Sequence, residues 1–462
     1  MSMNANLSYF MSRMQGVSTN VFRLEPQNSS TATPNQQIRF NLPSNALLNT
    51  RSIMLMFNAT TSGTTAGARL PPKIESLITR YELQAGGVQI SQGFDLYNVL
   101  VHAKSALLGS KTDSVLGHPE MVRAKSYVNG STIATTGNEV YADANGATQF
   151  GVCGFEGVLG SIQPSVLDTS LMPDLVLIFH LAGTEVLSSV AGITFSGTGG
   201  SDIDDDGAGG ASYTLNNIRL NCEVIGLASA VYDELIARRI SDVGYIELPF
   251  KSYQSFQDSH TGATKFSISC QSLDRIWVVQ RTAAFDTQGG AVPIAGYKIK
   301  GGFVGTAAAT ESAVTLDLGV PQYDAGGVLK TNGEKYTTKF FNMTLNESAA
   351  PAKFQLQMNG SYFPQTQMNV EEMYAITKNS VDHYAAEFMT LDQYRKNYFV
   401  QCFRFCLPDS GVREISGTDT RGINLACSYN TSGITNGSNV VVFAEHTSSL
   451  RVGANRSIEI IL

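Results

Sequence analysis

The residues closest to a metal-binding pattern form an acidic run, Asp202-Ile203-Asp204-Asp205-Asp206-Gly207. Its spacing is typical of the start of a calcium loop, in which alternate carboxylates converge on the ion and a glycine makes the sharp turn. The position that should carry a bidentate glutamate is Tyr213, however, and no helical pattern flanks the run. Two interpretations stay open, a weak calcium site and a solvated acidic loop, and the missing glutamate favours the second.

The histidines are scattered and make no zinc-binding pattern. HxxxH and HExxH are both absent from the sequence, which argues against a zinc enzyme. His180 lies in the apolar run Leu175–Leu181 and is expected to be a hydrogen-bonded core residue. The six histidines are His102, His118, His180, His260, His383 and His446.

Motifs for phosphate binding and for acyl transfer are also missing. Gly109-Ser110-Lys111-Thr112 resembles the end of a phosphate loop, but the pattern needs a glycine at the position of Lys104. No GxSxG nucleophile elbow occurs. We therefore assign no catalytic, cofactor-binding or metal-ligating residue, and we expect no enzyme and no cofactor.

The six cysteines lie mostly inside apolar runs. No CxxC pair occurs, and Cys402 and Cys406 are too far apart along one strand to form a disulfide. We predict six buried free thiols, as expected for a protein made inside a cell. The cysteines are Cys153, Cys222, Cys270, Cys402, Cys406 and Cys427.

The composition favours an all-β protein of two domains. The chain has 462 residues, 43 of them glycine, and only 15% of its residues are charged. Few amphipathic helices can be built from so little lysine and glutamate, whereas short runs of Val, Ile, Thr, Phe and Tyr between turn residues suit β-sandwiches. The net charge of −7 argues against a nucleic-acid binder. We expect neither a secretory signal nor a membrane helix, and so a soluble product of the cytosol.

One stretch, Leu77–Leu107, predicts a hairpin followed by a helix. Ile78 to Leu83 alternate with period two, and Gly86-Gly87 supplies the positive φ angles of a tight turn. From Phe94 the apolar residues recur at three- and four-residue steps, which is helical spacing. The stretch therefore predicts strand, turn, strand and helix.

Part of this pattern recurs about 270 residues later. Glu82 to Gly87 aligns with Gln355 to Gly360, and a helical run from Val370 to Ile376 follows. Ala230–Ile240 is the clearest helix, and beyond it the order of elements starts again. We predict one fold built twice, with domains at residues 1–241 and 242–462.

Further strands and loops complete this scheme. Trp277 is expected in a buried strand, Tyr213–Leu227 is expected to form two strand segments, and the apolar C-terminus is expected to pair into a sheet. The remaining strands are expected at Arg51–Phe57, Leu175–Leu181, Phe399–Phe405, Ile423–Tyr429, Val440–Phe443 and Ile458–Leu462. Long loops are expected at 109–165, 192–210 and 286–335.

Three segments resemble the double jelly-roll major capsid proteins, most closely those of virophages and polinton-like viruses. They are LITRYELQAGG with its following helix, IELPFKSYQSF at the start of the second half, and the ending from EISGTDTRGINLACSY to SIEIIL. The resemblance covers nearly the whole chain in order. It implies two tandem eight-stranded jelly-roll sandwiches with short accessory helices and long loops.

The same resemblance implies a structural subunit of an icosahedral shell around double-stranded DNA. The family forms homotrimers that are pseudo-hexagonal tiles, with the long loops as outward towers. Its partners are neighbouring capsomers, penton and minor capsid proteins, its location is the virion, and assembly takes place in the host cytoplasm or nucleus. The N-terminus, with only Arg13 and Arg23, departs from the basic terminus of the pattern and leaves contact with the genome or an inner membrane open. No sequence-specific binding of nucleic acid is expected.

Two other function classes stay open at this point. One is a vertex spike or adhesin that recognises a receptor or glycan. The other is a jelly-roll carbohydrate-active enzyme, for which no pair of catalytic carboxylates can be nominated from the sequence.

Overall fold

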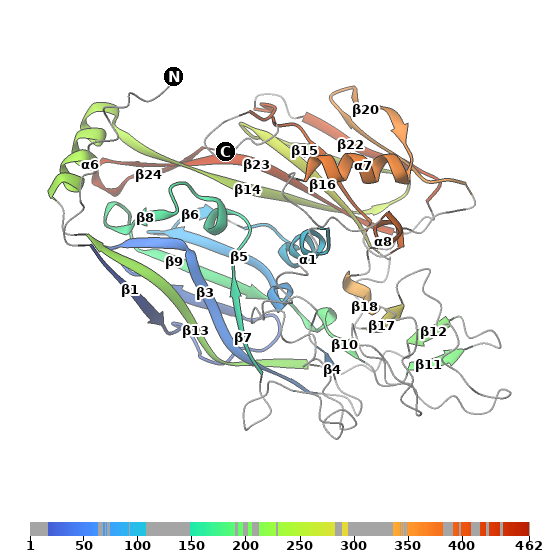
Figure 1. Cartoon of the computed structure of the whole chain (residues 1–462), viewed down its shortest axis with the longest axis horizontal. Helices are drawn as coiled ribbons and strands as arrows, with labels where there is room; N and C mark the ends of the chain where they lie inside the picture. Colours follow the sequence, from blue (N-terminus) through green and yellow to red (C-terminus); the bar gives the residue numbers. More distant parts are fainter. Residues whose placement is uncertain are drawn as a thin grey trace.

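The chain folds mainly into antiparallel β-strands, arranged in two lobes (Figure 1). The computed structural model describes residues 17–62, 68–69, 71, 74–91, 93–107, 148–189, 193–196, 202–205, 212–227, 230–281, 289–293, 336–341, 343, 345, 348, 350–381, 391–396, 399–407, 416–421, 425–434 and 438–461. Within these residues, no helix is long and apolar enough to cross a membrane.

The first lobe, which we call the N-terminal sandwich, consists of two sheets. Sheet 1 has the order β1-β13-β3-β7, and a short strand, β8, also pairs with β3. Sheet 2 has the order β2-β9-β5-β6. The strands of sheet 1 are β1 (Val17–Leu24), β13 (Ser212–Leu227), β3 (Leu47–Ser62), β7 (Thr148–Cys153) and β8 (Val166–Asp168). Those of sheet 2 are β2 (Gln37–Asn41), β9 (Leu175–Leu181), β5 (Ile78–Ala85) and β6 (Val88–Ser91).

The second lobe, the C-terminal sandwich, repeats this arrangement. Sheet 3 has the order β14-β23-β16-β21, with β24 also paired to β23, and sheet 4 has the order β15-β22-β19-β20. The strands of sheet 3 are β14 (Tyr245–His260), β23 (Ser438–Gly453), β16 (Leu273–Arg281), β21 (Val400–Arg404) and β24 (Ile458–Ile461). Those of sheet 4 are β15 (Ala263–Ile268), β22 (Leu425–Ser432), β19 (Lys353–Met358) and β20 (Ser361–Met368).

The two sandwiches have the same topology. When the main strands of each half are counted in chain order, both halves show the orders 1-8-3-6 and 2-7-4-5. This is the jelly-roll arrangement, in which strands far apart in sequence are neighbours in one sheet. The prediction of an all-β protein with two tandem eight-stranded jelly rolls is confirmed.

Alternating side chains build the core of each sandwich. In β2 the burial alternates residue by residue, so Ile38 and Phe40 face inward. Strand β16 differs because nearly all of its residues are buried, including Trp277. Both faces of sheet 3 are therefore covered along this strand, one by sheet 4 and the other by the N-terminal sandwich.

The predicted hairpin and helix are present in both halves. In the first half Gly86 and Gly87 have φ angles of 54° and 87°, and β5, β6 and α1 (Tyr97–Leu107) follow one another as expected. In the second half Asn359-Gly360 makes the turn between β19 and β20. Helix α7 (Val370–Ser380) then begins with a capping box formed by Asn369 and Glu372.

The other helices are short, apart from the linker between the sandwiches. Helix α6 (Ala230–Val243) joins β13 to β14, so the predicted boundary after residue 241 falls inside this helix. In the described part of the chain the remaining helices are α5 (Val158–Ser161) and α8 (Leu391–Lys396). The 3-10 turns are η2 (Ile74–Leu77), η3 (Thr169–Leu171), η4 (Thr184–Val186), η5 (Lys339–Phe341) and η6 (Ala454–Arg456).

A small fifth sheet combines strands from both halves of the sequence. Its order is β18-β17-β10-β4, and β10 pairs with β17 in parallel. The strands are β4 (Ala68–Arg69), β10 (Ser188–Ser189), β17 (Gly289–Pro293) and β18 (Tyr336–Thr338). The two halves are thus joined by backbone hydrogen bonds as well as by side chains.

The structure corrects several expected boundaries. Residues 213–227 form one bulged strand, β13, rather than two segments, because bulges interrupt the alternation without ending the strand. The expected loop 192–210 contains a hairpin of β11 (Ile193–Ser196) and β12 (Asp202–Asp205). Strand β7 and helix α5 lie in the expected loop 109–165, and β17 lies in 286–335. Residues 109–147, 286–288 and 294–335 of these two loops lie outside the described residues, as do Asp206 and Gly207.

Candidate functional site

The two sandwiches meet along a contact that we call the seam. Helices α1 and α5 of the N-terminal sandwich lie against β14, β16 and β23 of sheet 3 (Figure 1). The ring of Phe94 packs 4.9 Å from that of Tyr253 and 5.8 Å from that of Phe443. The backbone N–H of Gln163 donates to the carbonyl of Pro249 at 3.0 Å. Apolar contacts and a backbone hydrogen bond therefore cross between the halves.

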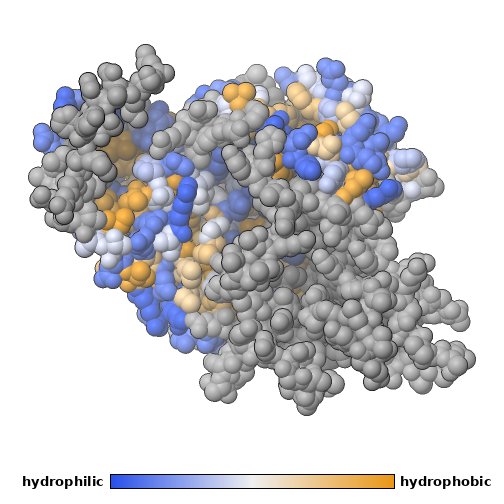
Figure 2. All heavy atoms as spheres, in the orientation of Figure 1, coloured by the Kyte–Doolittle hydropathy of each residue, from blue (hydrophilic) through white to orange (hydrophobic). Residues whose placement is uncertain are grey.

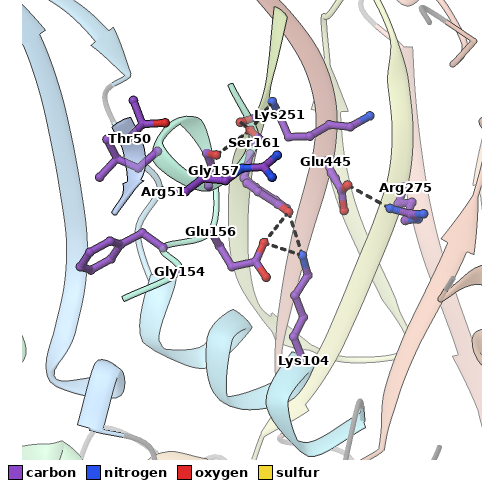
Figure 3. Close-up of a pocket in the computed structure, with 14 residues that line it drawn as sticks. Thr50, Arg51, Lys104, Gly154, Glu156, Gly157, Ser161, Lys251, Arg275 and Glu445 are labelled. Carbon is purple, nitrogen blue, oxygen red and sulfur yellow. Dashed lines mark hydrogen bonds and ion pairs between the residues drawn. The ribbon is translucent and has the colours of Figure 1, made fainter. Parts of the chain in front are cut away.

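A cleft of about 520 Å³ lies at the seam and has polar walls from both halves (Figure 3). Its charged side chains come from β3, from α1, from the turn before α5, and from three strands of sheet 3. Figure 3 shows Lys104 and Glu156 pointing toward each other on one side, and Glu445 and Arg275 paired on the other.

Lys104 is the centre of the first group. Its Nζ atom lies 3.0 Å from Oε2 of Glu156 and donates to the hydroxyl of Tyr253 at 2.8 Å. The Tyr253 hydroxyl also donates to Glu156 at 3.2 Å, which closes a triangle across the seam. Nζ lies 5.0 Å and 5.1 Å from the ring centres of Tyr253 and Trp277, within the range of cation–π attraction. Burial alone would lower the pKa of Lys104, but Glu156 and Glu445 raise it, so the side chain stays charged.

Glu445 is the centre of the second group. It is 3% exposed, accepts a hydrogen bond from Nε1 of Trp277 at 2.9 Å and lies 3.1 Å from Nη1 of Arg275. Burial alone would raise the pKa of Glu445. Lys104, Arg275, Trp277 and Lys251 together reverse this effect and lower the pKa to about 2. The carboxylate is therefore ionised at neutral pH although its side chain is buried.

A third pair extends the polar network into sheet 3. Lys251 Nζ lies 2.8 Å from Oδ2 of Asp274, which is 1% exposed, and it donates to the hydroxyl of Thr447 at 2.9 Å. The same Asp274 oxygen accepts from Thr447 at 2.7 Å. The backbone N–H of Lys251 donates to Oγ of Ser161 at 2.8 Å, so this pair is also tied to the N-terminal sandwich.

The chemistry of these groups favours holding the halves together. Each of the carboxylates Glu156, Glu445 and Asp274 has a cationic partner. A general base must be able to accept a proton near neutral pH, which the pKa of Glu445 does not allow. Breaking a buried ion pair costs about 3–5 kcal/mol, because the remaining charge is left without a partner. Each ion pair lies within one half, and the hydrogen bonds of Tyr253 with Lys104 and Glu156 and of Lys251 with Ser161 connect them across the seam, which fixes the relative position of the two sandwiches.

The residues considered from the sequence are not brought together into a site. Among the residues that the structure describes, no three His, Cys, Asp or Glu side chains lie close enough to hold a metal ion. Asp202 to Asp205 form strand β12 paired with β11, so the expectation of an open loop at these positions is wrong. The two residues that would complete the calcium pattern, Asp206 and Gly207, fall outside the described part of the chain.

His180 and the cysteines fit their expected roles only in part. His180 is hydrogen-bonded, with Nε2 2.9 Å from Oε1 of Glu82, but its side chain is half-buried rather than in the core. All six cysteines are free thiols, as predicted. Cys153 and Cys406 are half-buried instead of buried, and burial raises the pKa of Cys222 to about 11 and that of Cys427 to about 12.

The residues of the seam were not identified from the sequence. A signal for them exists, since Glu445 ends a long apolar run and Lys104 interrupts an apolar helix. Charged residues at such positions are expected to be paired, because an isolated buried charge is costly. Their partners could not be named, because Lys104 and Tyr253 are 149 residues apart in the chain.

The fold is similar to that of several viral capsid proteins of known structure. No protein-family model and no curated protein sequence matches the chain. The crystal structure of PBCV-1 VP54, fitted into a reconstruction of the virophage Sputnik, superimposes with a TM-score of 0.56 and 14% identity, over 97% of this chain and 98% of that one. The PBCV-1 capsid model gives a TM-score of 0.55 with 14% identity and the same coverage. The Faustovirus major capsid protein gives 0.54 with 10% identity, over 95% of this chain and 91% of that one. At these identities the comparison establishes a shared fold along the whole chain.

Proposed function

We propose that the chain is the major capsid protein of an icosahedral double-stranded DNA virus. One observation carries this proposal: two jelly rolls of identical strand order follow one another, and the pair matches capsid proteins over 97% of the chain. A partial match would fit a single jelly-roll module, which occurs in lectins and other binding proteins. A match over both halves and their connection supports a shell subunit instead.

The seam supports a structural role on independent grounds. A subunit that repeats over a closed shell needs rigid domains and interfaces with fixed geometry. The hydrogen bonds of Tyr253 with Lys104 and Glu156, together with the packing of Phe94 on Tyr253 and Phe443, fix one sandwich on the other. The role proposed here is structural, and it requires no catalytic activity and no cofactor.

The assembled unit in this proposal is a homotrimer in which six sandwiches form a pseudo-hexagonal tile. The domains are residues 1–241 and 242–462. Neighbouring tiles, penton and minor capsid proteins are its partners in the virion, and the long loops at 109–165, 192–210 and 286–335 form the outward towers. The small sheet supports the tower role, because three of its strands, β10, β17 and β18, lie in or next to two of these loops, 192–210 and 286–335.

The mass of the purified protein in solution tests this proposal. Light scattering at micromolar concentration should give about 149 kDa, three times the 49.6 kDa chain. A monomer of 49.6 kDa at the same concentration would argue against a capsid tile. A trimer that occupies only the vertices of the particle would favour a spike, so imaging of the particle is the complementary experiment.

A further inference from the structure

Side chains at the surface of the two lobes do not single out a docking site. Among the residues coloured in Figure 2, hydrophobic side chains lie in small groups between hydrophilic ones. The backbone of sheet 3 gives a clearer signal. Its order is β14-β23-β16-β21, so β14 is an edge strand, and it runs over 16 residues. A long edge strand carries backbone N–H and C=O groups that can pair with a strand of another chain.

One end of this edge is covered by the N-terminal sandwich. The carbonyl of Pro249 accepts a hydrogen bond from the backbone N–H of Gln163 at 3.0 Å. The backbone N–H of Lys251 donates to Oγ of Ser161 at 2.8 Å. The backbone groups of Pro249 and Lys251 therefore point away from β23. In an antiparallel ladder, residues that point away from the neighbouring strand alternate with residues that are bonded to it.

The same alternation identifies the outward groups along the rest of β14. Its register with β23 continues without a shift as far as His260, so the backbone groups of Tyr253, Ser255 and Gln257 also point outward. In the described part of the chain, nothing donates to these groups or accepts from them. Ser255 is half-buried and Gln257 is exposed. This part of the edge is therefore open to a further strand.

Two clefts lie along the open part of the edge. One is the cleft of about 520 Å³ at the seam, which Lys251 and Tyr253 line. The other has a volume of about 440 Å³ and is lined by four consecutive residues of β14, Ser252 to Ser255. Consecutive side chains of a strand point to opposite faces, so a cleft lined by four residues in a row follows the edge of the strand. Tyr253 lines both clefts, which places them next to each other.

Arg51 adds a positive charge to the first cleft that no described carboxylate balances. The cleft has four cationic side chains, and the other three each have a carboxylate partner. Arg51 is exposed, and no ion pair joins it to another residue in the described part of the chain. In Figure 3 its side chain extends from β3 toward the middle of the cleft. A guanidinium group can bind a carboxylate through two parallel hydrogen bonds.

Together these features fit an extended peptide that carries an acidic side chain. The open backbone groups of β14 recur at every second residue, which is also the interval at which a paired strand presents its own groups. The cleft beside them has space for a side chain, and Arg51 favours Asp or Glu there. A small anion such as phosphate would match the charge of Arg51 but would leave the backbone edge unused.

We propose that the edge of β14 from Tyr253 to Gln257 binds an extended segment of a partner protein, which adds a strand to sheet 3 and places an acidic side chain on Arg51. This site rests on the proposed function, in which other proteins of the virion contact the subunit, and it assigns a surface to one of them. Strand β14 belongs to the C-terminal sandwich and Arg51 to the N-terminal one, so the bound segment spans the seam. Binding should therefore stabilise the folded chain.

Hydrogen exchange with short peptides tests the strand addition. Two capped peptides, Glu-Val-Thr-Val-Thr and Thr-Val-Thr-Val-Glu, place the acid at opposite ends and so cover both strand directions. At millimolar concentration, one of them should slow the amide exchange of the wild-type protein between Tyr253 and Gln257. The same peptide with all its amides N-methylated should give no protection, because it cannot donate to the edge. The peptide with Gln in place of Glu should bind about tenfold more weakly in calorimetry, as expected for the loss of one charge-assisted hydrogen bond.

Two substitutions test the same contact from the side of the protein. Ser255→Pro removes an N–H group that points away from β23, so the ladder stays intact, as it does at Pro249, and peptide binding should be lost. Arg51→Gln should weaken binding of the Glu peptide about tenfold and leave binding of the Gln peptide unchanged. Arg238→Gln is the matched control, since Arg238 is an exposed arginine on α6 that lines neither cleft, and it should bind like the wild type. Urea unfolding verifies that each variant is folded, and the N-methylated peptide replaces Ser255→Pro if that variant is not.

The outcomes separate this site from the proposed function. The site is overturned if neither peptide protects β14, or if the Glu and Gln peptides bind equally well. Inorganic phosphate that displaces the Glu peptide, together with normal binding of the N-methylated peptide, would show an anion site without strand addition and overturn it too. An edge that is protected without peptide and loses this protection on dilution is covered by a second copy, which overturns the assignment to a partner protein. The mass of the wild-type protein without peptide, measured separately, decides on the proposed trimer.

Discussion

Replacing Glu445 by glutamine tests the physical basis of the seam. The amide has the shape of the carboxylate and can still accept the hydrogen bond from Trp277, but it carries no charge. Lys104 and Arg275 then lose one of the buried carboxylates that balance their positive charges. We expect the variant to fold and to be less stable than the wild type at neutral pH.

The size of this effect follows from the pKa of Glu445. Its partners lower that pKa from the usual 4.5 to about 2. Each pKa unit corresponds to about 1.4 kcal/mol, so the ionised form stabilises the fold by about 3 kcal/mol at pH 7. Because the folded pKa lies below the unfolded one, this stabilisation is fully present above about pH 4.5 and is lost as the pH falls toward 2.

The assay is urea unfolding of both proteins at the same concentration between pH 2 and pH 7. Trp277 is the only tryptophan in the chain and donates directly to Glu445, so its fluorescence reports on the seam. Glu371→Gln is the control, because its partner Arg395 is 3.6 Å away and both side chains are about half-exposed. An exposed pair contributes at most about 1 kcal/mol.

The expected result is a difference of about 3 kcal/mol between wild type and Glu445→Gln at pH 7 that shrinks toward zero at pH 2. The control should show a small difference. A loss below about 1 kcal/mol for Glu445→Gln, or a loss of the same size at both ends of the pH range, would refute the role given to this carboxylate.

Urea unfolding also measures four further substitutions, two at the seam and two at glycines next to strand β6. Tyr253→Phe removes the hydroxyl that joins Lys104 to Glu156 and should lower the free energy of unfolding by about 1–3 kcal/mol, and an unchanged value would contradict the triangle. Phe94→Ala removes a buried ring that packs across the seam on Tyr253 and Phe443, and it should lower the free energy of unfolding by about 3–5 kcal/mol. The two sandwiches should then unfold in separate steps. A single transition at the wild-type urea concentration would contradict this expectation. Gly93→Ala should be more harmful than Gly87→Ala, because a Cβ at Gly93 would lie 2.2 Å from a backbone oxygen while one at Gly87 meets nothing within 4 Å. We expect a loss of about 1–2 kcal/mol at Gly87, where positive φ alone is strained, and equal losses at the two positions would contradict this reasoning.

Local signals predicted much of the fold. The hairpin at Gly86-Gly87 and its partner at Asn359-Gly360 depend on residues that are adjacent in sequence, so their turn chemistry and periodicity could be read directly. The strand Leu175–Leu181 and the helix that begins at Ala230 were predicted for the same reason. Bulges defeated the prediction at Tyr213–Leu227, because they shift the alternation while the strand continues.

The seam could not be predicted, because it depends on the relative position of two finished domains. Lys104 was visible as a charge in an apolar helix, but Glu156 is 52 residues away and Tyr253 is 149 residues away. No local pattern connects positions at such separations.

Imaging of the native particle tests the capsid assignment most directly. Cryo-electron microscopy of particles that contain this chain should show it in many copies over all the icosahedral faces, as trimeric tiles with six sandwiches each. A particle in which the chain is found only at the vertices, on a shell made of another protein, would contradict the assignment and favour a spike.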